Sequence, residues 1–195
     1  MKEHKIIKNI ISKDLCNFLH EYLISKKEIL KTLRETKYIS PFSSIHGELN
    51  GDPQVPGSFC IYGDAALDLI LLKIMPIIEK TLKTKLSPTY SYARIYKKGD
   101  VLKKHVDRES CAISGTLNLG GDLWPIYLKD NYKKTHEVIL NPGDILIYDG
   151  CNFEHWREEF NKELCTQVFL HYNNKNSKNI YDNRKHLGLP INIKA

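Results

Sequence analysis

The sequence predicts a mainly β fold with supporting helices near its N-terminus, in the α+β class. Three observations lead to this prediction. Apolar residues recur at helical spacing only in the first 85 residues, short alternating stretches fill the rest, and turn segments such as "KKGD", "LGGD" and "NPGD" separate those stretches. Many short strands without intervening helices indicate an antiparallel sandwich or jelly roll.

The composition is that of one globular domain. The chain has 195 residues, of which 42% are hydrophobic and 27% charged, which argues against wholesale disorder. We therefore expect a single domain over 1–195. The net charge of +6 would suit an anionic partner, but the lysines are scattered and form no dense block. Solvated surface is the favoured interpretation, and a nucleic-acid partner stays open as an alternative.

Cysteine usage and the N-terminal segment indicate the compartment. The five cysteines are odd in number, widely spaced and never in a C-x-x-C pair, which favours free thiols in a reducing environment. The opening "MKEHKIIKNIISKDL" interrupts its apolar residues with Lys and Asn, and no later run approaches the length of a membrane span. We expect a cytoplasmic protein with no membrane association.

Two helices are expected before most of the strands. The first covers 14–33, with Ser12 as N-cap and apolar residues at helical spacing. The second runs from about Ala65 to Leu82 with Asp64 as N-cap, and Pro76 inside it predicts a kink or a break. These helices, within about 1–85, should support the sheet.

Between the helices lies a loop over 40–59, "SPFSSIHGELNGDPQVPGSF", which is rich in Gly, Pro and Ser. It is either a lid over a binding site or a plain linker. The strands expected after it are "TYSYARIY" (89–96), "CAISGTLNL" (111–119), "WPIYL" (124–128), "THEVIL" (135–140), "DILIYDG" (144–150) and "TQVFLHY" (166–172).

A possible metal site lies in "HVDRESCAISGTLNLGG". His105 and Asp107 are two residues apart, so in an extended strand both side chains would leave the same face. His155 follows a strand and a short turn, where a neighbouring strand would begin. Two histidines and one carboxylate suit non-haem Fe(II), with coordination positions left open. An accidental H-x-D, a zinc site, and His171 in place of His155 are the alternatives.

The segments "YARIYKKGDVLKKHVDR", "PGDILIYDGCNFEHWRE", "QVFLHY" and "NRKHLGLP" together resemble the prolyl-4-hydroxylase-type branch of the Fe(II)- and 2-oxoglutarate-dependent oxygenases. The resemblance implies a cupin-like double-stranded β-helix over about 86–190. It also implies Fe(II) on His105, Asp107 and His155, with 2-oxoglutarate and O2 as cosubstrates. The implied reaction hydroxylates an unactivated C–H bond of a protein, peptide or small metabolite, releasing succinate and CO2.

The sequence departs from the family at the 2-oxoglutarate site. Members commonly carry Arg or Lys about ten residues after the distal His, where this chain reads Leu164–Gln167. A buried dicarboxylate needs a cationic partner. Arg157 is the first candidate and Arg94 the second, and a structural ion pair is the alternative for each. Tyr96 occupies a position where the family often has a Tyr near 2-oxoglutarate, and Thr116 could donate a hydroxyl.

Other side chains near the predicted site have simpler interpretations. Trp156 is expected to anchor the core, and Cys111 and Cys151 to be small buried residues that are not nucleophiles. Two rival functions stay open: a non-catalytic β-sandwich binding module, and an oxygenase directed at nucleic acid.

Overall fold

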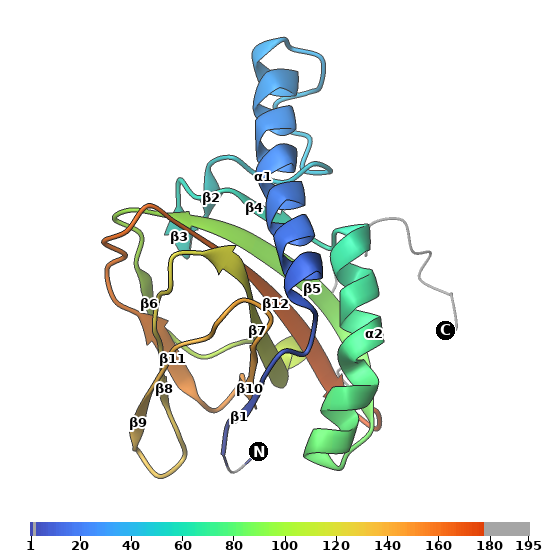
Figure 1. The fold of residues 1–195 in the computed structure, drawn as a ribbon, viewed down its shortest axis with the longest axis vertical. Helices are drawn as coiled ribbons and strands as arrows, with labels where there is room; N and C mark the ends of the chain where they lie inside the picture. Colours follow the sequence, from blue (N-terminus) through green and yellow to red (C-terminus); the bar gives the residue numbers. More distant parts are fainter. Residues whose placement is uncertain (2, 178–195) are drawn as a thin grey trace.

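The computed structural model describes residues 1 and 3–177. The predicted closing segment of the resemblance, 183–190, lies outside the described residues. Within them the protein is a layered β structure with two helices on one side (Figure 1).

The two helices begin at the predicted caps. Helix α1 is Lys13–Glu35, and the hydroxyl of Ser12 accepts a hydrogen bond from the backbone N–H of Leu15 at 3.2 Å. Helix α2 is Ala65–Leu82, capped by the side chain of Asp64. The break expected at Pro76 is wrong: the helix continues through it, because buried residues before and after the proline anchor both halves in the core.

The larger sheet has six antiparallel strands, in the order β1-β10-β7-β12-β5-β4. Its strands are β1 (Lys5–Ile7), β4 (Cys60–Tyr62), β5 (Leu86–Lys97), β7 (Ile113–Gly121), β10 (Ile145–Asp149) and β12 (Leu164–Asn174). Both helices cover one face of this sheet (Figure 1), and the main hydrophobic core lies between the helices and the sheet. Its other face is left for the second sheet and the site.

The smaller sheet has four strands, in the order β6-β11-β8-β9. They are β6 (Leu102–His105), β8 (Ile126–Lys129), β9 (Thr135–Val138) and β11 (Glu154–Arg157). Two small clusters of buried residues pack between the sheets, one of them around Leu128, Leu146 and Phe153. The mainly β jelly roll predicted from the sequence is confirmed.

The predicted loop over 40–59 contains a two-stranded hairpin of β2 (Gly51–Asp52) and β3 (Val55–Pro56). A short 3-10 helix, η1 (Glu109–Cys111), precedes β7. The hairpin places Asp52 against the rim of the cavity described below.

Two further features concern the cysteines and the helices. All five cysteines are unpaired thiols. Among the described residues, no helix combines the length and the apolar character needed to cross a membrane.

Candidate active site

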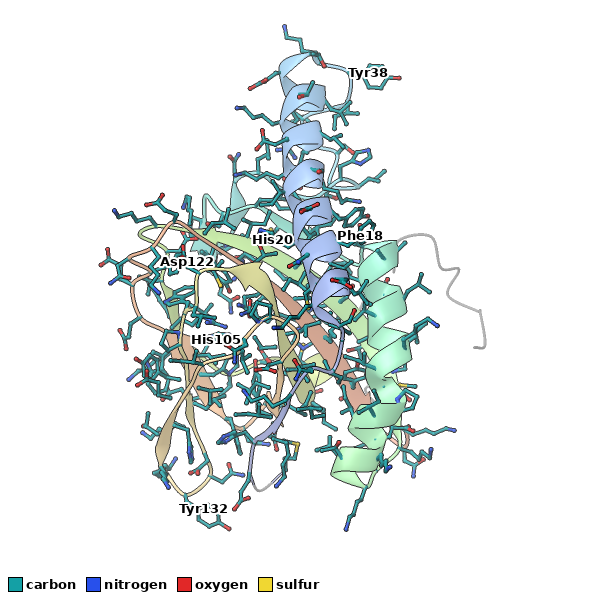
Figure 2. All side chains as sticks on the ribbon, viewed as in Figure 1. Phe18, His20, Tyr38, His105, Asp122 and Tyr132 are labelled. Carbon is teal, nitrogen blue, oxygen red and sulfur yellow. The ribbon has the colours of Figure 1, made fainter. Side chains whose placement is uncertain are left out.

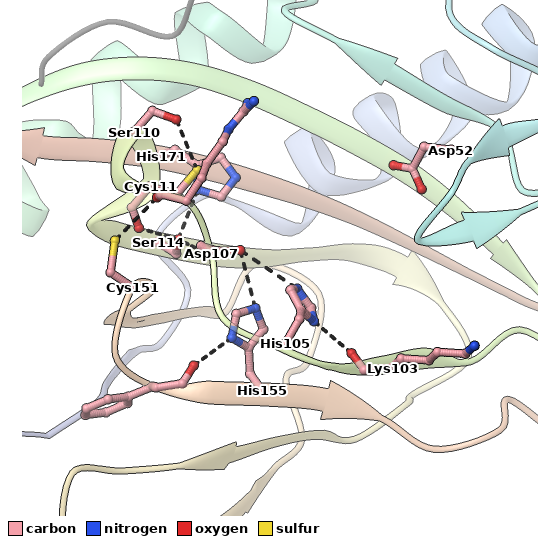
Figure 3. Close-up of polar contacts among 12 residues, drawn as sticks. Asp52, Lys103, His105, Asp107, Ser110, Cys111, Ser114, Cys151, His155 and His171 are labelled. Atoms are coloured by element: carbon pink, nitrogen blue, oxygen red, sulfur yellow. Dashed lines mark hydrogen bonds and ion pairs between the residues drawn. The ribbon is translucent and has the colours of Figure 1, made fainter.

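The structure brings His105, Asp107 and His155 together. Strands β6 and β11 pair antiparallel with His105 opposite His155, and the two imidazole rings lie 4.2 Å apart between centroids. One ligand atom from each of the three side chains lies within 4.8 Å of the other two. Figure 3 shows the three side chains converging from two strands and the loop after β6.

One detail of the predicted motif is wrong. His105 and Asp107 do not share a strand, because β6 ends at His105 and Asp107 lies in the following loop. The backbone N–H of Asp107 donates to the carbonyl oxygen of Gly150 at 2.7 Å, so the loop is tied to the turn before β11. The carboxylate therefore reaches the histidines through this loop contact and not through strand alternation.

Hydrogen bonds define which nitrogen of each histidine faces the centre. The Nδ1–H of His105 donates to the carbonyl oxygen of Lys103 at 2.8 Å, and that of His155 to the carbonyl oxygen of Phe153 at 2.9 Å. A carbonyl accepts only, so in the neutral form of each ring the lone pair is on Nε2. They lie 3.8 and 3.6 Å from Oδ1 of Asp107. Burial lowers the pKa of His155, which favours the neutral ring that a metal needs.

The second oxygen of Asp107 faces away from the histidine pair. Oδ2 lies 2.5 Å from the hydroxyl of Ser114, which in turn lies 3.0 Å from Nδ1 of His171. His171, the alternative third ligand, thus lies on the opposite side of Asp107 from His105 and His155. A second group of potential ligand atoms, Asp107, Cys111 and His171, shares only the carboxylate with the first.

A cavity of about 290 Å³ opens on the three predicted ligands. Its walls are rich in aromatic side chains, and its rim includes Asp52 from the hairpin. The lining residues are Asp52, Gln54, Tyr90, Tyr92, Arg94, Tyr96, Leu102, His105, Val106, Asp107, Arg108, Cys111, Ile126, Tyr148, His155, Phe169 and His171.

Arg94 lines this cavity but is already paired. Its guanidinium donates to Oδ2 of Asp52 at 2.5 Å and to the hydroxyl of Tyr96 at 3.2 Å. The hydroxyl of Tyr92 donates to the same aspartate oxygen at 2.6 Å. Burial by itself would raise the pKa of Asp52, but Arg94 and these hydrogen bonds outweigh it, so the pKa lies below its ordinary value. This pair matches the ion-pair alternative considered for Arg94.

Arg157, in contrast to Arg94, is buried away from the cavity lining and is not paired with a carboxylate among the described residues. Its side chain is buried, with 1% exposed, and one N–H donates to the carbonyl oxygen of Trp124 at 2.5 Å. Within residues 1 and 3–177 it has no carboxylate partner, and its Nε has no acceptor. The pairing of β11 with β6 shifts between His155 and Arg157, and Arg157 is not among the side chains that line the cavity. It lies close enough to Tyr148, a lining residue, to influence the phenol electrostatically.

Two further buried polar atoms near the interior are incompletely bonded. In the described part of the chain, Oε1 of Gln167 has no hydrogen-bond partner, and Oγ1 of Thr116 has none apart from its approach to the phenol of Tyr148. Thr116 lies opposite Phe169, a lining residue, in the pairing of β7 with β12. Gln167 lies opposite Arg94, in the region where the family commonly has its basic residue. Unsatisfied buried atoms of this kind are expected where a polar ligand belongs.

Residues outside the predicted set also shape the site. Ser114 contacts Asp107, Gly150 accepts its N–H, and the ring of Tyr148 lies 4.8 Å from that of His155. Ser114 is two residues before Thr116, so strand alternation alone could have placed it on the same face. Asp52 and Gly150 left no comparable signal in the sequence.

The remaining predictions near the site are partly confirmed. Trp156 is 8% exposed, stacks with Tyr127 and does not line the cavity, as expected of a packing residue. Cys111 is buried as predicted. Cys151 is partly exposed, which corrects the prediction, because it lies in the turn before β11, where its thiol donates to the carbonyl oxygen of Arg108.

Comparison with known proteins gives a likeness in structure but not in sequence. No protein-family model and no curated protein matches the chain. The structure is similar to a prolyl-4-hydroxylase from Pseudomonas putida, with 13% identity over 88% of this chain and 92% of that one and a TM-score of 0.61.

Two further solved structures are similar. The viral collagen prolyl hydroxylase vCPH from Paramecium Bursaria Chlorella virus-1, in complex with 2-oxoglutarate, has 12% identity over 87% of this chain and 94% of that one, and a TM-score of 0.57. HygX from Streptomyces hygroscopicus, with nickel, 2-oxoglutarate and hygromycin B bound, has 10% identity over 88% of this chain and 83% of that one, and a TM-score of 0.55. The chain therefore has the double-stranded β-helix fold of the 2-oxoglutarate oxygenases, as its sequence motifs predicted.

Proposed function

We propose that this protein is an Fe(II)- and 2-oxoglutarate-dependent dioxygenase that hydroxylates an unactivated C–H bond, with 1–195 forming a single domain. One observation carries the proposal. Two histidines whose Nδ1 atoms are fixed by backbone carbonyls direct both Nε2 atoms toward one carboxylate oxygen, inside a cavity. Two neutral imidazoles and one carboxylate are the donor set of non-haem Fe(II) sites with open positions.

In this proposal His105, Asp107 and His155 hold the metal. When bound, Fe(II) would supply the activation of O2 that the side chains themselves lack. The chain contributes geometry: the Nδ1 bonds fix the ring orientation, and the loop bond to Gly150 fixes the carboxylate. Aromatic side chains, including Tyr148 and Phe169, line part of the cavity and would limit the access of water to the oxidising centre.

We assign the distal carboxylate of 2-oxoglutarate to Arg157. A buried guanidinium without a carboxylate partner is costly, so an anionic ligand would relieve it. The hydroxyl of Thr116 would add a second donor, and Tyr148, which interacts with both Thr116 and Arg157, lines the cavity. Arg94, with Tyr96, is the competing candidate, and there the ligand would have to displace Asp52.

The size of the cavity favours a small reacting group. A volume of about 290 Å³ is at the lower end for ligand sites and must also hold the cosubstrate. A single side chain of a peptide or a small metabolite is therefore the proposed substrate class. The similar structures include two prolyl hydroxylases and a protein crystallised with hygromycin B, which span these two classes.

The decisive experiment is anaerobic addition of Fe(II) and 2-oxoglutarate to the purified protein. The enzyme should develop a weak visible charge-transfer band, whereas a binding module should not. His105→Ala, Asp107→Ala and His155→Ala should each abolish the band. His136→Ala is the matched control, because His136 also pairs with an aspartate, Asp130, but lies outside the cavity. A wild-type protein that neither binds Fe(II) nor forms the band would refute the proposal.

The same titration separates the two arginines. Arg157→Ala should weaken 2-oxoglutarate binding by about 2–5 kcal/mol while Fe(II) binding survives, and Arg157→Lys should recover only part. If Arg94→Ala has the larger effect, the assignment moves to Arg94. If neither variant loses affinity, either a lysine holds the carboxylate or 2-oxoglutarate is not the cosubstrate, and the function assignment would have to be reopened.

A further inference from the structure

The carboxylate of Asp107 is held from the side opposite the histidine pair. Ser114 lies on β7, and its hydroxyl contacts three groups: Oδ2 of Asp107 at 2.5 Å, Nδ1 of His171 at 3.0 Å and the carbonyl oxygen of Cys111 at 3.1 Å. Ser114 is fully buried and His171 is 6% exposed. Figure 3 shows these side chains on the far side of Asp107 from His105 and His155.

Proton counting determines the direction of these hydrogen bonds. A serine hydroxyl has one proton, and an ionised carboxylate only accepts. The contact to the charged oxygen of Asp107 is much shorter than that to the Cys111 carbonyl, so the proton goes to Asp107. The Ser114 oxygen then accepts from the Nδ1–H of His171. A chain of donors runs from His171 through Ser114 to Oδ2 of Asp107.

We infer that Ser114, supported by His171, is a positioning residue that makes Asp107 bind its metal through one oxygen only. The inference rests on the proposed function. Oδ1 faces the two Nε2 atoms at 3.6 and 3.8 Å, while Oδ2 is occupied by the Ser114 hydroxyl. A carboxylate that binds through both oxygens would fill a coordination position that cosubstrate and O2 require.

The surroundings of the chain favour a fixed arrangement. The ring of His171 packs against that of Tyr90 at 4.6 Å between centroids, which holds the donor in place. A side chain at Gly150 would lie 2.5 Å from the Ser114 hydroxyl, so only glycine leaves room for this contact. Hydrogen bonds to a ligand from outside the coordination sphere commonly set its orientation and the affinity for the metal.

The test uses Co(II) alone as the probe, so that it does not depend on turnover. Titrations compare the wild type with Ser114→Ala, His171→Phe and the control Ser110→Ala. Ser110 is the matched serine because it contacts Cys111 at 3.8 Å and not Asp107. We expect Ser114→Ala to weaken Co(II) binding by about 10–100-fold. Its visible absorption should also lose intensity, because a second carboxylate oxygen raises the coordination number.

His171→Phe keeps an aromatic ring beside Tyr90 but removes the donor, and should change both readouts in the same direction by a smaller amount. Ser110→Ala should match the wild type. A Ser114→Ala protein with wild-type affinity and spectrum would overturn the inference and leave the proposed function intact. If that variant does not fold, an unchanged His171→Phe protein overturns the inference equally. A wild type that binds no Co(II) would instead contradict the metal site itself.

Discussion

Gly150→Ala should disable the metal site although the substitution adds a single methyl group. The backbone at Gly150 is of a kind that alanine can adopt, so the conflict is one of space. An added Cβ would lie 2.2 Å from the carbonyl oxygen of Cys111 and 2.6 Å from Oδ2 of Asp107, where ordinary contacts begin at 3.4 Å. The first of these atoms belongs to the backbone, so it cannot rotate away.

The magnitude follows from these contacts. Forcing a methyl group into a filled site costs about 1–3 kcal/mol of unfolding free energy. For a chain of this length each kcal/mol corresponds to about 2–4 °C in Tm. The larger effect falls on the site, because displacing the carboxylate by even about 1 Å can reduce activity on the order of a hundredfold. We expect Fe(II) affinity to fall at least tenfold.

The assays are thermal unfolding of the metal-free protein and anaerobic Fe(II) titration. Gly120→Ala is the matched control, because Gly120 is also a buried glycine and the nearest atoms to its added Cβ belong to the His20 side chain, at 3.2 Å and beyond. This ring can shift, so the control should keep its Fe(II) affinity. A Gly150→Ala protein with wild-type Fe(II) affinity would refute the tight packing around Asp107.

Three more predictions concern stability and the hairpin. Asp64→Ala removes both the α2 cap and the ion pair with Lys26, so urea denaturation should show a loss of about 2–4 kcal/mol, with a smaller loss for Asp64→Asn, which keeps the cap; an Asp64→Asn protein as stable as the wild type would contradict the role of charge. Burial is the largest cause that lowers the pKa of His20 and of His4. As the pH falls, these two histidines therefore become protonated at a higher pH in the unfolded chain than in the folded protein. The free energy of unfolding should therefore fall as the pH drops below the ordinary histidine pKa of 6.5. His20→Gln should make this fall shallower in urea melts from pH 7 to pH 5. A steeper fall in the variant would mean that the pKa of His20 is raised, not lowered, in the folded protein. Asp52→Asn weakens the contact to Arg94, so limited proteolysis should cut 40–59 faster than in the wild type, and an unchanged rate would argue against a lid held by this pair.

Local patterns in the sequence predicted much of the fold. Helix α2 spans the predicted Ala65–Leu82 with its predicted cap at Asp64, because capping and apolar spacing are properties of neighbouring residues. The alternation in "TYSYARIY" predicted a strand with Tyr92, Arg94 and Tyr96 on one face, and those three side chains line the cavity. Pro76 shows the limit of such rules, since packing on both sides kept the helix continuous.

The spacing of the predicted ligands came from the sequence, but their convergence did not. His155 was placed at the start of a strand, and only the pairing of β11 with β6 sets it opposite His105. Asp107 was expected on a strand beside His105, and its loop position depends on a bond to Gly150, 43 residues later in the chain. Contacts of this kind depend on the topology that joins distant segments, which short-range periodicity does not record.

The two arginines show most clearly which properties the sequence predicts and which depend on the tertiary structure. The sequence identified Arg94 and Arg157 as candidate cations once its resemblance to the oxygenases implied a dicarboxylate ligand, because the family's usual basic position lacks a positive residue here. The tertiary structure decided that Arg94 is neutralised by Asp52, 42 residues away, and that Arg157 is buried without a carboxylate partner among the described residues. The physical reason is that residue type fixes the charge, whereas burial and counter-ions depend on which segments the fold brings together.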